Sequence, residues 1–143
     1  MHDAQRNRIL DSFAAQSLMC SCKARITDLA PGSCVIEAPL LPGMLQQHGA
    51  GHAGVTFALG DTAAGYAALS LMPEGREVMT AEIKINLLAP AFGETLVARG
   101  RVVKSGRRLS VVTAEVEAVA ADGACKLIAV MQGTMVPVDP AGG

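Results

Sequence analysis

The longest apolar segment of the chain runs from Ala53 to about Met72 and is built largely from very small residues. Because it is longer than an ordinary strand, it predicts a helix over 53–72, which Pro73-Glu74-Gly75 ends. Alanine and glycine leave little side-chain bulk on any face of this helix, at positions 53, 54, 58, 60, 63, 64, 65, 67 and 68. A sheet can therefore wrap closely around the helix, which offsets the poor helix propensity of its glycines.

The segments on both sides of this helix carry patterns typical of strands. Two are expected before it, at 19–29 and 33–38, and four after it, at 77–89, 94–104, 107–119 and 124–136. The turn signals between the last four are Pro90 to Gly93, Ser105-Gly106 and Asp122-Gly123. In the run 77–89, the apolar residues at 79, 81, 83, 85 and 87 alternate with Thr80, Glu82, Lys84 and Asn86.

The first residues have a helical rhythm instead. Ile9, Leu10 and Phe13 share one side of the segment 3–17, which predicts a covering helix within residues 1–18. A helix, two strands, a buried helix and four consecutive antiparallel strands indicate the α+β class. At 143 residues, half of them hydrophobic, the chain is expected to form a single domain over 1–143.

Charge and hydropathy narrow the classes of function. The net charge of −1 argues against nucleic acid as the main partner. Every apolar run is interrupted before it could span a bilayer, and the first ten residues lack the apolar centre of a secretion signal, so we expect a cytoplasmic protein with no membrane partner. The four cysteines, Cys20, Cys22, Cys34 and Cys125, are expected to be reduced, buried or half-buried structural thiols. No second close cysteine pair accompanies Cys20 and Cys22, so no metal site is predicted.

The stretch from His48 to Asp61 carries the strongest functional signal. A loop rich in glycine and histidine leads directly into the apolar helix, whose one carboxylate is Asp61. The start of a helix offers unpaired backbone N–H groups, and a lone acid among apolar residues invites a perturbed environment. Together they are typical of half of a hydrolytic site. The plainer interpretation is a helix acid that a neighbouring backbone or hydroxyl group satisfies.

Three features in this order resemble the hotdog-fold acyl-CoA thioesterases, and most of all the branch named for the phenylacetate-degradation thioesterase PaaI. They are His52-Ala53-Gly54, the small-residue helix with Asp61 nine positions after His52, and the run from Thr80 to Pro90, TAEIKINLLAP. The resemblance covers roughly residues 20–136. It implies a sheet wrapped around the central helix, a homodimer whose two sheets join, often a dimer of dimers, and a medium-chain or aryl acyl-CoA substrate. It implies no separate cofactor, because coenzyme A is part of the substrate.

The resemblance also implies roles for five residues. Asp61 would be the general base or nucleophile, and the backbone N–H of Ala53 would be the oxyanion donor, where the family usually has glycine. His52 would order the loop, Gln46 stands where the family often has asparagine, and Thr80 falls where a hydroxyl orients water. For the last three, a solvent-facing loop histidine, a polar loop amide and a packed hydroxyl remain alternatives.

Binding of the substrate would fall to further residues. Coenzyme A carries phosphates, and Lys104, Arg107 and Arg108 place three cations around the predicted turn at Gly106. A solvated turn is the alternative for each of them. We also expect Gly54 and Asn86 to contact the substrate. Apolar side chains that can line an acyl or aryl pocket are Met44, Phe57, Leu59, Tyr66, Met72 and Met79. Ordinary core packing is the default for most of them.

One chain cannot complete this site alone. Nine residues of helix span about 13 Å, and His52 and Asp61 point to opposite sides of the axis. A two-fold partner that runs antiparallel would bring one chain's carboxylate to the other chain's loop. Two other functions stay open: a hotdog hydratase or dehydratase, which the absence of histidine within 53–72 disfavours, and a non-catalytic acyl-CoA-binding dimer, which the departures at Gln46 and Ala53 allow.

Overall fold

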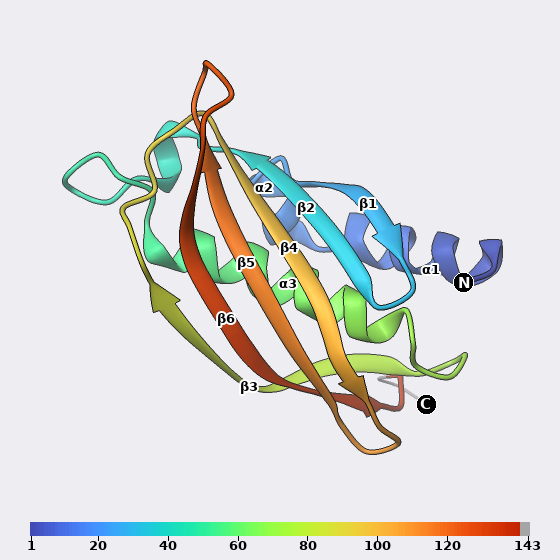
Figure 1. Ribbon diagram of the computed structural model, residues 1–143. Coiled ribbons are helices and arrows are strands. Elements are labelled where there is room, and N and C mark those ends of the chain that lie inside the picture. Colours follow the sequence, from blue (N-terminus) through green and yellow to red (C-terminus); the bar gives the residue numbers. More distant parts are fainter. Residues whose placement is uncertain (141–143) are drawn as a thin grey trace.

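In the computed structural model, which describes residues 1–140, the small-residue segment forms one helix, α3 (Ala53–Leu69), and an antiparallel sheet of six strands wraps around it (Figure 1). The strand order is β1-β2-β4-β5-β6-β3, so β1 and β3 are the edges. The predicted α+β class and the hotdog arrangement are confirmed. The strands are β1 (Arg25–Ala30), β2 (Ser33–Pro39), β3 (Glu77–Leu87), β4 (Thr95–Ser105), β5 (Ser110–Val119) and β6 (Cys125–Val138).

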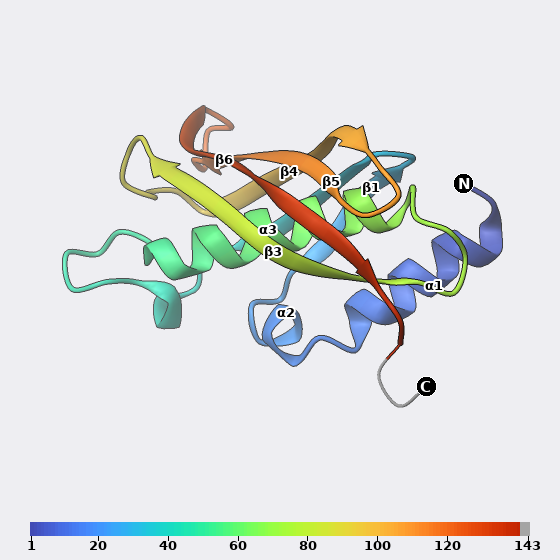
Figure 2. The ribbon, with the colours of Figure 1, turned by 90° about the horizontal axis from the view of Figure 1, so that it is seen from below.

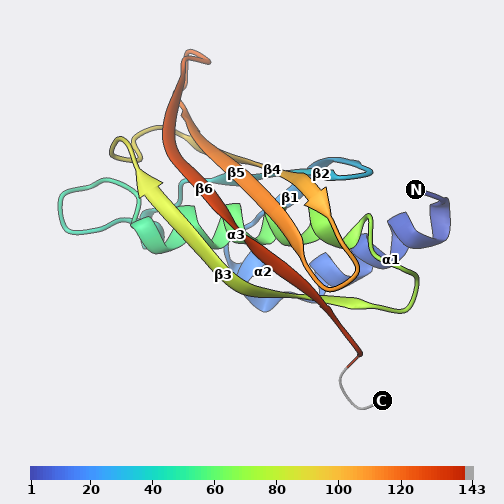
Figure 3. The same ribbon diagram turned by 60° about the horizontal axis from the view of Figure 1, so that its bottom comes forward.

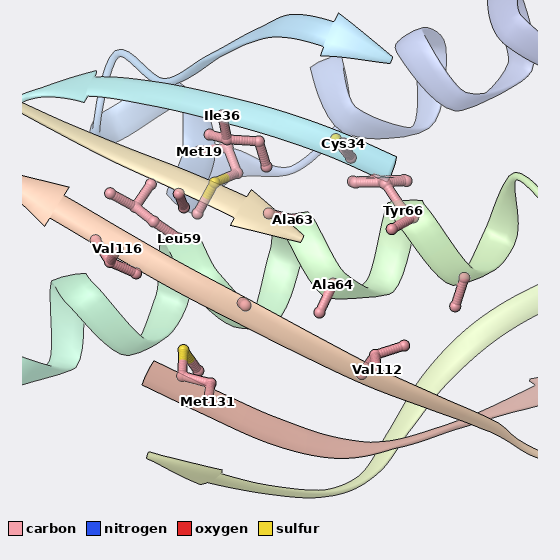
Figure 4. Close-up of a cluster of buried hydrophobic side chains, with 14 of the residues drawn as sticks. Met19, Cys34, Ile36, Leu59, Ala63, Ala64, Tyr66, Val112, Val116 and Met131 are labelled. Carbon is pink, nitrogen blue, oxygen red and sulfur yellow. The ribbon is translucent and has the colours of Figure 1, made fainter. Parts of the chain in front are cut away.

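The small residues of α3 are what let the sheet approach. A Cβ at Gly100 of β4 would overlap the backbone of Ala63, so strand and helix touch main chain to main chain. Likewise, a Cβ at Gly60 would overlap the Met131 thioether of β6. In the close-up of the core, Ala63 and Ala64 face the strands while Leu59 and Val116 fill the space between (Figure 4). Close packing of this kind gains dispersion energy on every side of the helix.

The N-terminal segment covers the second half of α3, as expected, but it forms two helices. These are α1 (Asp3–Ala14) and α2 (Ser17–Ser21), which lie on the side of α3 away from most of the sheet (Figure 2). Gln16 leaves the helical conformation and donates a hydrogen bond to the Tyr66 hydroxyl at 2.8 Å. The Phe13 and Tyr66 rings meet edge to face at 6.0 Å. The prediction of one helix over 3–17 is therefore wrong at its end.

Three other predicted boundaries are corrected. The first strand begins at Arg25 rather than 19, because Met19 belongs to α2 and is buried in the core. The central helix ends at Leu69 rather than 72, where the Ser70 hydroxyl donates to the Ala67 carbonyl and accepts from the Gly32 N–H. The strand expected from 107 begins at Ser110, because a longer turn over 106–109 precedes it. The predicted domain extends to 143, and residues 141–143 lie outside the described part.

The cysteines divide into two pairs. Cys34 is fully buried, and burial, with a smaller contribution from Asp28, raises the pKa of its thiol to about 12. Cys22 is also buried, which raises its pKa. The thiols of Cys20 and Cys125 are exposed, so the expectation that all four are buried or half-buried is wrong for these two, which lie at the end of α2 and the start of β6.

Two negative observations apply to residues 1–140. None of their helices combines the length and the hydropathy that crossing a membrane requires. Over the same residues, no three histidine, cysteine, aspartate or glutamate side chains gather closely enough to hold a metal ion.

The contact between Gly100 and α3 leads to a prediction. Substitution of Gly100 by alanine should lower the free energy of unfolding by about 3 kcal/mol or more, since the added methyl group meets backbone that cannot move aside. Gly43→Ala is the control, because nothing lies within 4 Å of a Cβ at that position, and it should change stability by no more than about 0.5 kcal/mol. Urea unfolding of both variants measures the difference, and equal stabilities would contradict the close contact.

Candidate active site

The loop between β2 and α3 is held in place by backbone pairing. After the 3-10 turn η1 (Pro42–Met44), isolated bridges join Leu45 to Gly51 and Gly51 to Ala91. A Cβ at Gly51 would lie 2.9 Å from the Leu40 side chain and 3.0 Å from that of Ala91. Glycine at this position therefore lets the loop lie flat against the segment that follows β3. The loop projects beyond the start of α3 (Figure 3).

His52 is the N-cap of α3. Its Nδ1 accepts a hydrogen bond from the Gly54 N–H at 2.8 Å, which leaves the ring proton on Nε2. A Cβ at residue 54 would lie 2.9 Å from that same Nδ1 atom, so Gly54 keeps room for the cap. The N–H of Ala53 is one of the first-turn donors that has no carbonyl of its own helix to bind, and this residue is exposed. The start of α3 thus presents one directed donor with the positive end of the helix dipole behind it.

Gln46 lies beside this donor. Its backbone N–H donates to the Ala50 carbonyl. Its side-chain Oε1 accepts a hydrogen bond from the His48 N–H, which holds the side chain in place by its oxygen. Nε2 is the end left to act as a donor. Gln46, Ala53 and Thr56 line an open cavity of about 400 Å³ whose other wall is the segment 87–91. We name this the donor cavity.

Asp61 lies further along α3 and is half-buried. Its Oδ1 accepts a hydrogen bond of 2.7 Å from the Thr80 hydroxyl of β3. The two residues line a second cavity of about 200 Å³, which Tyr66 and Met135 also border and which we name the carboxylate cavity. Burial raises the pKa of the Tyr66 hydroxyl, opposed in part by its hydrogen bonds with the α1 side chain Ser12 and with Gln16.

A β-bulge in β3 decides where Thr80 points. Strict alternation would place Thr80 on the same face as Lys84 and Asn86, but the register with β6 shifts between Thr80 and Glu82. Ala81 is the extra residue, so Thr80 faces α3 together with Ile83, which packs against the core. The expected alternation along 77–89 is therefore wrong at this point.

The donor cavity and the carboxylate cavity have no residue in common. Positions 53 and 61 are separated by about 12 Å of helix. Within one chain, the backbone donor of Ala53 and the Asp61 carboxylate therefore cannot act on the same carbonyl group. This is the separation that the sequence predicts: in one chain the two groups lie in different cavities.

A carboxylate held by a hydroxyl, and a helix start with a free donor beside an amide, are the components of an ester-cleaving site. A family model described as "Thioesterase superfamily" matches residues 48–123, more than half of the chain, including the end of the loop from His48, α3 and Thr80. The chain belongs to the thioesterase superfamily. It is thus a thioesterase-family hydrolase, and an acyl thioester is the substrate that the family implies.

Solved structures agree with this family. A thioesterase family protein from Silicibacter pomeroyi is 42% identical, with 95% of this chain and 99% of that one covered and a TM-score of 0.92. The PaaI protein of E. coli, from the phenylacetic acid degradation operon, is 24% identical over 94% of this chain and 93% of its own, with a TM-score of 0.82. A thioesterase from Haemophilus influenzae is 21% identical over 94% and 92%, with a TM-score of 0.80. The latter two similarities concern the fold.

The structure of this thioesterase brings some predicted residues together and separates others. Lys104, Gly106, Arg107 and Arg108 gather around the β4–β5 turn, where they line a cavity of about 350 Å³. Asn86 lies on the outer face of the sheet, in a groove with Arg99 and Arg101, apart from both the donor cavity and the carboxylate cavity.

The expected acyl-pocket side chains also divide. Tyr66 borders the carboxylate cavity, and Phe57 is half-buried on α3. Leu59 and Met72 are core residues, and Met44 is buried under the loop. Met79 is 59% exposed on the edge strand and lines neither the donor cavity nor the carboxylate cavity of one chain.

Several residues of the carboxylate cavity are not among the predicted site residues, and three of them lie far from Asp61 in the sequence. Ser12 comes from α1, Gln16 from the junction between α1 and α2, and Met135 from the last strand. No local pattern connects them with Asp61, since only the packing of α1 and the register of β6 bring them there. A polar pair on one side of an amphipathic helix was the one available signal, and surface helices commonly carry such pairs.

The cap on α3 leads to a second prediction. His52→Ala removes the acceptor of the Gly54 N–H and should lower the free energy of unfolding by about 1 kcal/mol. His52→Asn supplies another capping acceptor and should stay within a few tenths of a kcal/mol of the native protein. His48→Ala, in the same exposed loop, is the control. Equal stabilities of the alanine and asparagine variants in urea would show that His52 has no capping role.

Proposed function

We propose that this protein is an acyl-CoA thioesterase that hydrolyses the thioester of a medium-chain or aryl acid, in a site that two subunits share. The observation that carries the proposal is the Asp61–Thr80 hydrogen bond in one half-site, with the donors of Ala53 and Gln46 in the other. A thioester needs both an attacking or basic group and donors for its carbonyl oxygen. Neither half-site of one chain has both.

The first half of α3 offers a surface for the second subunit. Exposed or half-buried residues follow one another along one stripe of the helix, at positions 53, 54, 57, 58, 61 and 62, whereas residues 63–69 are all buried. The α1 helix covers the second half of α3, and within residues 1–140 this stripe has no such cover. A second copy of the chain is the occupant that we propose.

The edge strand β3 supports the same arrangement. It is 11 residues long and has no neighbouring strand on its outer side within residues 1–140, and the exposed apolar side chains of Met79 and Leu87 lie on it beside charged ones, so it is a long open edge that can pair with another strand. Antiparallel pairing of β3 with its copy would join the two sheets and reverse the direction of the second α3. The start of one helix would then approach the Asp61 of the other. Two such dimers would assemble into the expected dimer of dimers.

In this arrangement the thioester carbonyl oxygen accepts from the Ala53 N–H and the Gln46 amide of one subunit. Asp61 of the other subunit takes a proton from water while the water oxygen bonds to the carbonyl carbon. The tetrahedral intermediate then expels the coenzyme A thiolate, which takes up a proton, and leaves the free acid. Asp61 can alternatively attack the carbonyl carbon itself and break the carbon–sulfur bond, so that the coenzyme A thiolate leaves and takes up a proton. Water then hydrolyses the acyl-aspartyl anhydride to the free acid and the Asp61 carboxylate.

The basic turn between β4 and β5 would hold the coenzyme A phosphates. Lys104, Arg107 and Arg108 are exposed around an apolar hollow formed by Leu109 and Val111. Cations at the edge of an apolar surface suit a ligand that has both an aromatic base and phosphates. This combination supports coenzyme A as the thiol part of the proposed substrate.

Complementation between subunits tests the shared site. Ala53→Pro removes the N–H but is compatible with the first turn of a helix and with the extended conformation of His52 (φ −62°, ψ 135°). Ala53→Pro and Asp61→Asn should each lower kcat/KM for an acyl-CoA by about a hundredfold or more, measured as thiol release. Mixed dimers that contain one subunit of each kind should recover part of the activity, because one of their two sites has both native halves.

The controls separate folding from chemistry. Asp11→Asn, an exposed carboxylate on α1, should keep full activity. Verified mixed dimers without recovered activity would contradict the shared site. An Asp61→Asn variant that turns over normally would remove Asp61 from the mechanism and favour the hydratase or binding-protein alternatives.

A fourth prediction concerns the basic turn. The double variant Arg107→Ala/Arg108→Ala should raise KM for an acyl-CoA by about threefold to tenfold, because two exposed cation–phosphate contacts are lost. The same acyl group on N-acetylcysteamine, which has no phosphates, should keep its KM. Arg25→Ala is the matched control, because it removes an exposed cation from the edge strand β1, which is not part of the β4–β5 turn. Equal KM changes for the two thioesters would show that the turn does not bind phosphate.

A further inference from the structure

The Thr80 hydroxyl has two acceptors for one proton. Its Oγ1 lies 2.7 Å from Asp61 Oδ1 and 3.3 Å from the Sδ atom of Met135. A carboxylate is the stronger acceptor, and a thioether is a weak one. The Thr80 hydroxyl therefore donates its hydrogen bond mainly to Asp61 and more weakly to the sulfur of Met135, as in a three-centre hydrogen bond. The Asp61–Thr80 pair of the proposed site thus has a third member.

The backbone of β6 determines this contact. Thr80 pairs with Met135 in the register of β3 and β6, immediately before the bulge at Ala81. After the bulge, Ile83 pairs with Gly133, where a Cβ would overlap the backbone of β3. Glycine at 133 therefore lets the two strands lie close together beside the bulge. The bulge turns Thr80 toward α3 and seats its hydroxyl between the carboxylate and the sulfur.

The surroundings of Met135 fix the position of its side chain beside Thr80. It is fully buried, and it forms part of the wall of the carboxylate cavity. A methionine of this kind usually fills an irregular gap in the core, a task that leucine can perform with almost the same volume. Leucine, however, offers no acceptor to the hydroxyl. The two roles of Met135, packing and acceptance, can therefore be separated by a single substitution.

The chemistry of Asp61 gives this sharing a consequence. A hydrogen bond from Thr80 stabilises the negative charge of the carboxylate and so makes it a weaker base and a weaker nucleophile. Because the Thr80 hydroxyl also donates to the thioether of Met135, its hydrogen bond to Asp61 is weaker, and the carboxylate loses less of its basicity and nucleophilicity. The proton stays bonded to the Thr80 oxygen throughout, and the electron pair that takes the proton of water, or attacks the carbonyl carbon, comes from Asp61.

We propose that Met135 is a positioning residue of the thioesterase reaction: its thioether shares the Thr80 hydroxyl with Asp61 and keeps the carboxylate reactive. The inference rests on the proposed function, because it assigns the chemistry to Asp61. It adds a residue on the last strand that takes part through Thr80 and does not itself touch the thioester. Its effect requires the hydroxyl of Thr80, and this dependence distinguishes it from packing.

A double-mutant cycle tests the proposal. Met135→Leu should lower kcat for an acyl-CoA by about threefold to tenfold and leave KM within about twofold, since only the reactivity of Asp61 changes. In the Thr80→Val background, where no hydroxyl is present to share, the same Met135→Leu substitution should change kcat by less than about 1.5-fold. Single-turnover assays at high enzyme concentration allow slow variants to be measured.

Met131→Leu is the matched control. Met131 is a second buried methionine of β6, and its sulfur faces Gly60 in the core rather than Thr80. It should leave kcat within about twofold in both backgrounds. An equal loss of kcat from Met135→Leu with and without the Thr80 hydroxyl would overturn the proposal and reduce Met135 to packing. So would an unchanged kcat in the native background.

The failure of this inference can be told from the failure of the proposed function. Asp61→Asn reports on the function itself. If it stays active, both proposals fall, because the sharing then has no reactive carboxylate to act on. If it loses activity but Met135→Leu shows no dependence on Thr80, the shared active site stands and the role of the thioether alone is refuted.

Discussion

The close approach of the sheet to the central helix is the constraint on which the rest of this structure depends. At Gly100 and Ala63 the two elements meet at their backbones, and at Gly60 a methionine sulfur fills the space that a side chain would need. A helix with ordinary side chains would hold the strands several ångströms further away. The curvature of the sheet, and with it the reach of β3 to Asp61, would then be lost. The glycines that allow this contact lower the helix propensity of α3, and burial on several sides of the helix offsets that loss.

The wrapping leaves one stripe of the helix outside the sheet, and the proposed function depends on this stripe. Along its second half, the stripe is covered by the α1 helix, with Phe13 against the Tyr66 ring. Along its first half, it carries Asp61 between the half-buried Phe57 and the start of the buried segment. In the proposed dimer, this half-buried carboxylate would lie next to a surface that the second chain covers. In that proposal a single chain holds the parts of two half-sites rather than one complete site.

Local irregularities of the backbone place the reactive groups. The His52 cap turns the first donors of α3 outward, while the bulge at Ala81 turns Thr80 inward. Each depends on a glycine that gives room to a neighbour: Gly54 to the imidazole, and Gly133 to the backbone of the edge strand. Regular helix and strand geometry supplies the frame. The departures from it at these two points determine which polar groups face a ligand.

Much of this could be predicted from the sequence, because the signals are local. The length and small residues of 53–69 specify a wrapped helix, the turn residues separate the strands, and the spacing of His52 from Asp61 already implies two half-sites. What a linear pattern cannot contain is a contact between distant segments. The period of two along 77–89 carries no trace of the bulge, because the bulge arises from the register against β6. For the same reason the contact of Thr80 with Met135 and the approach of Ser12 to Tyr66 were decided by tertiary packing alone.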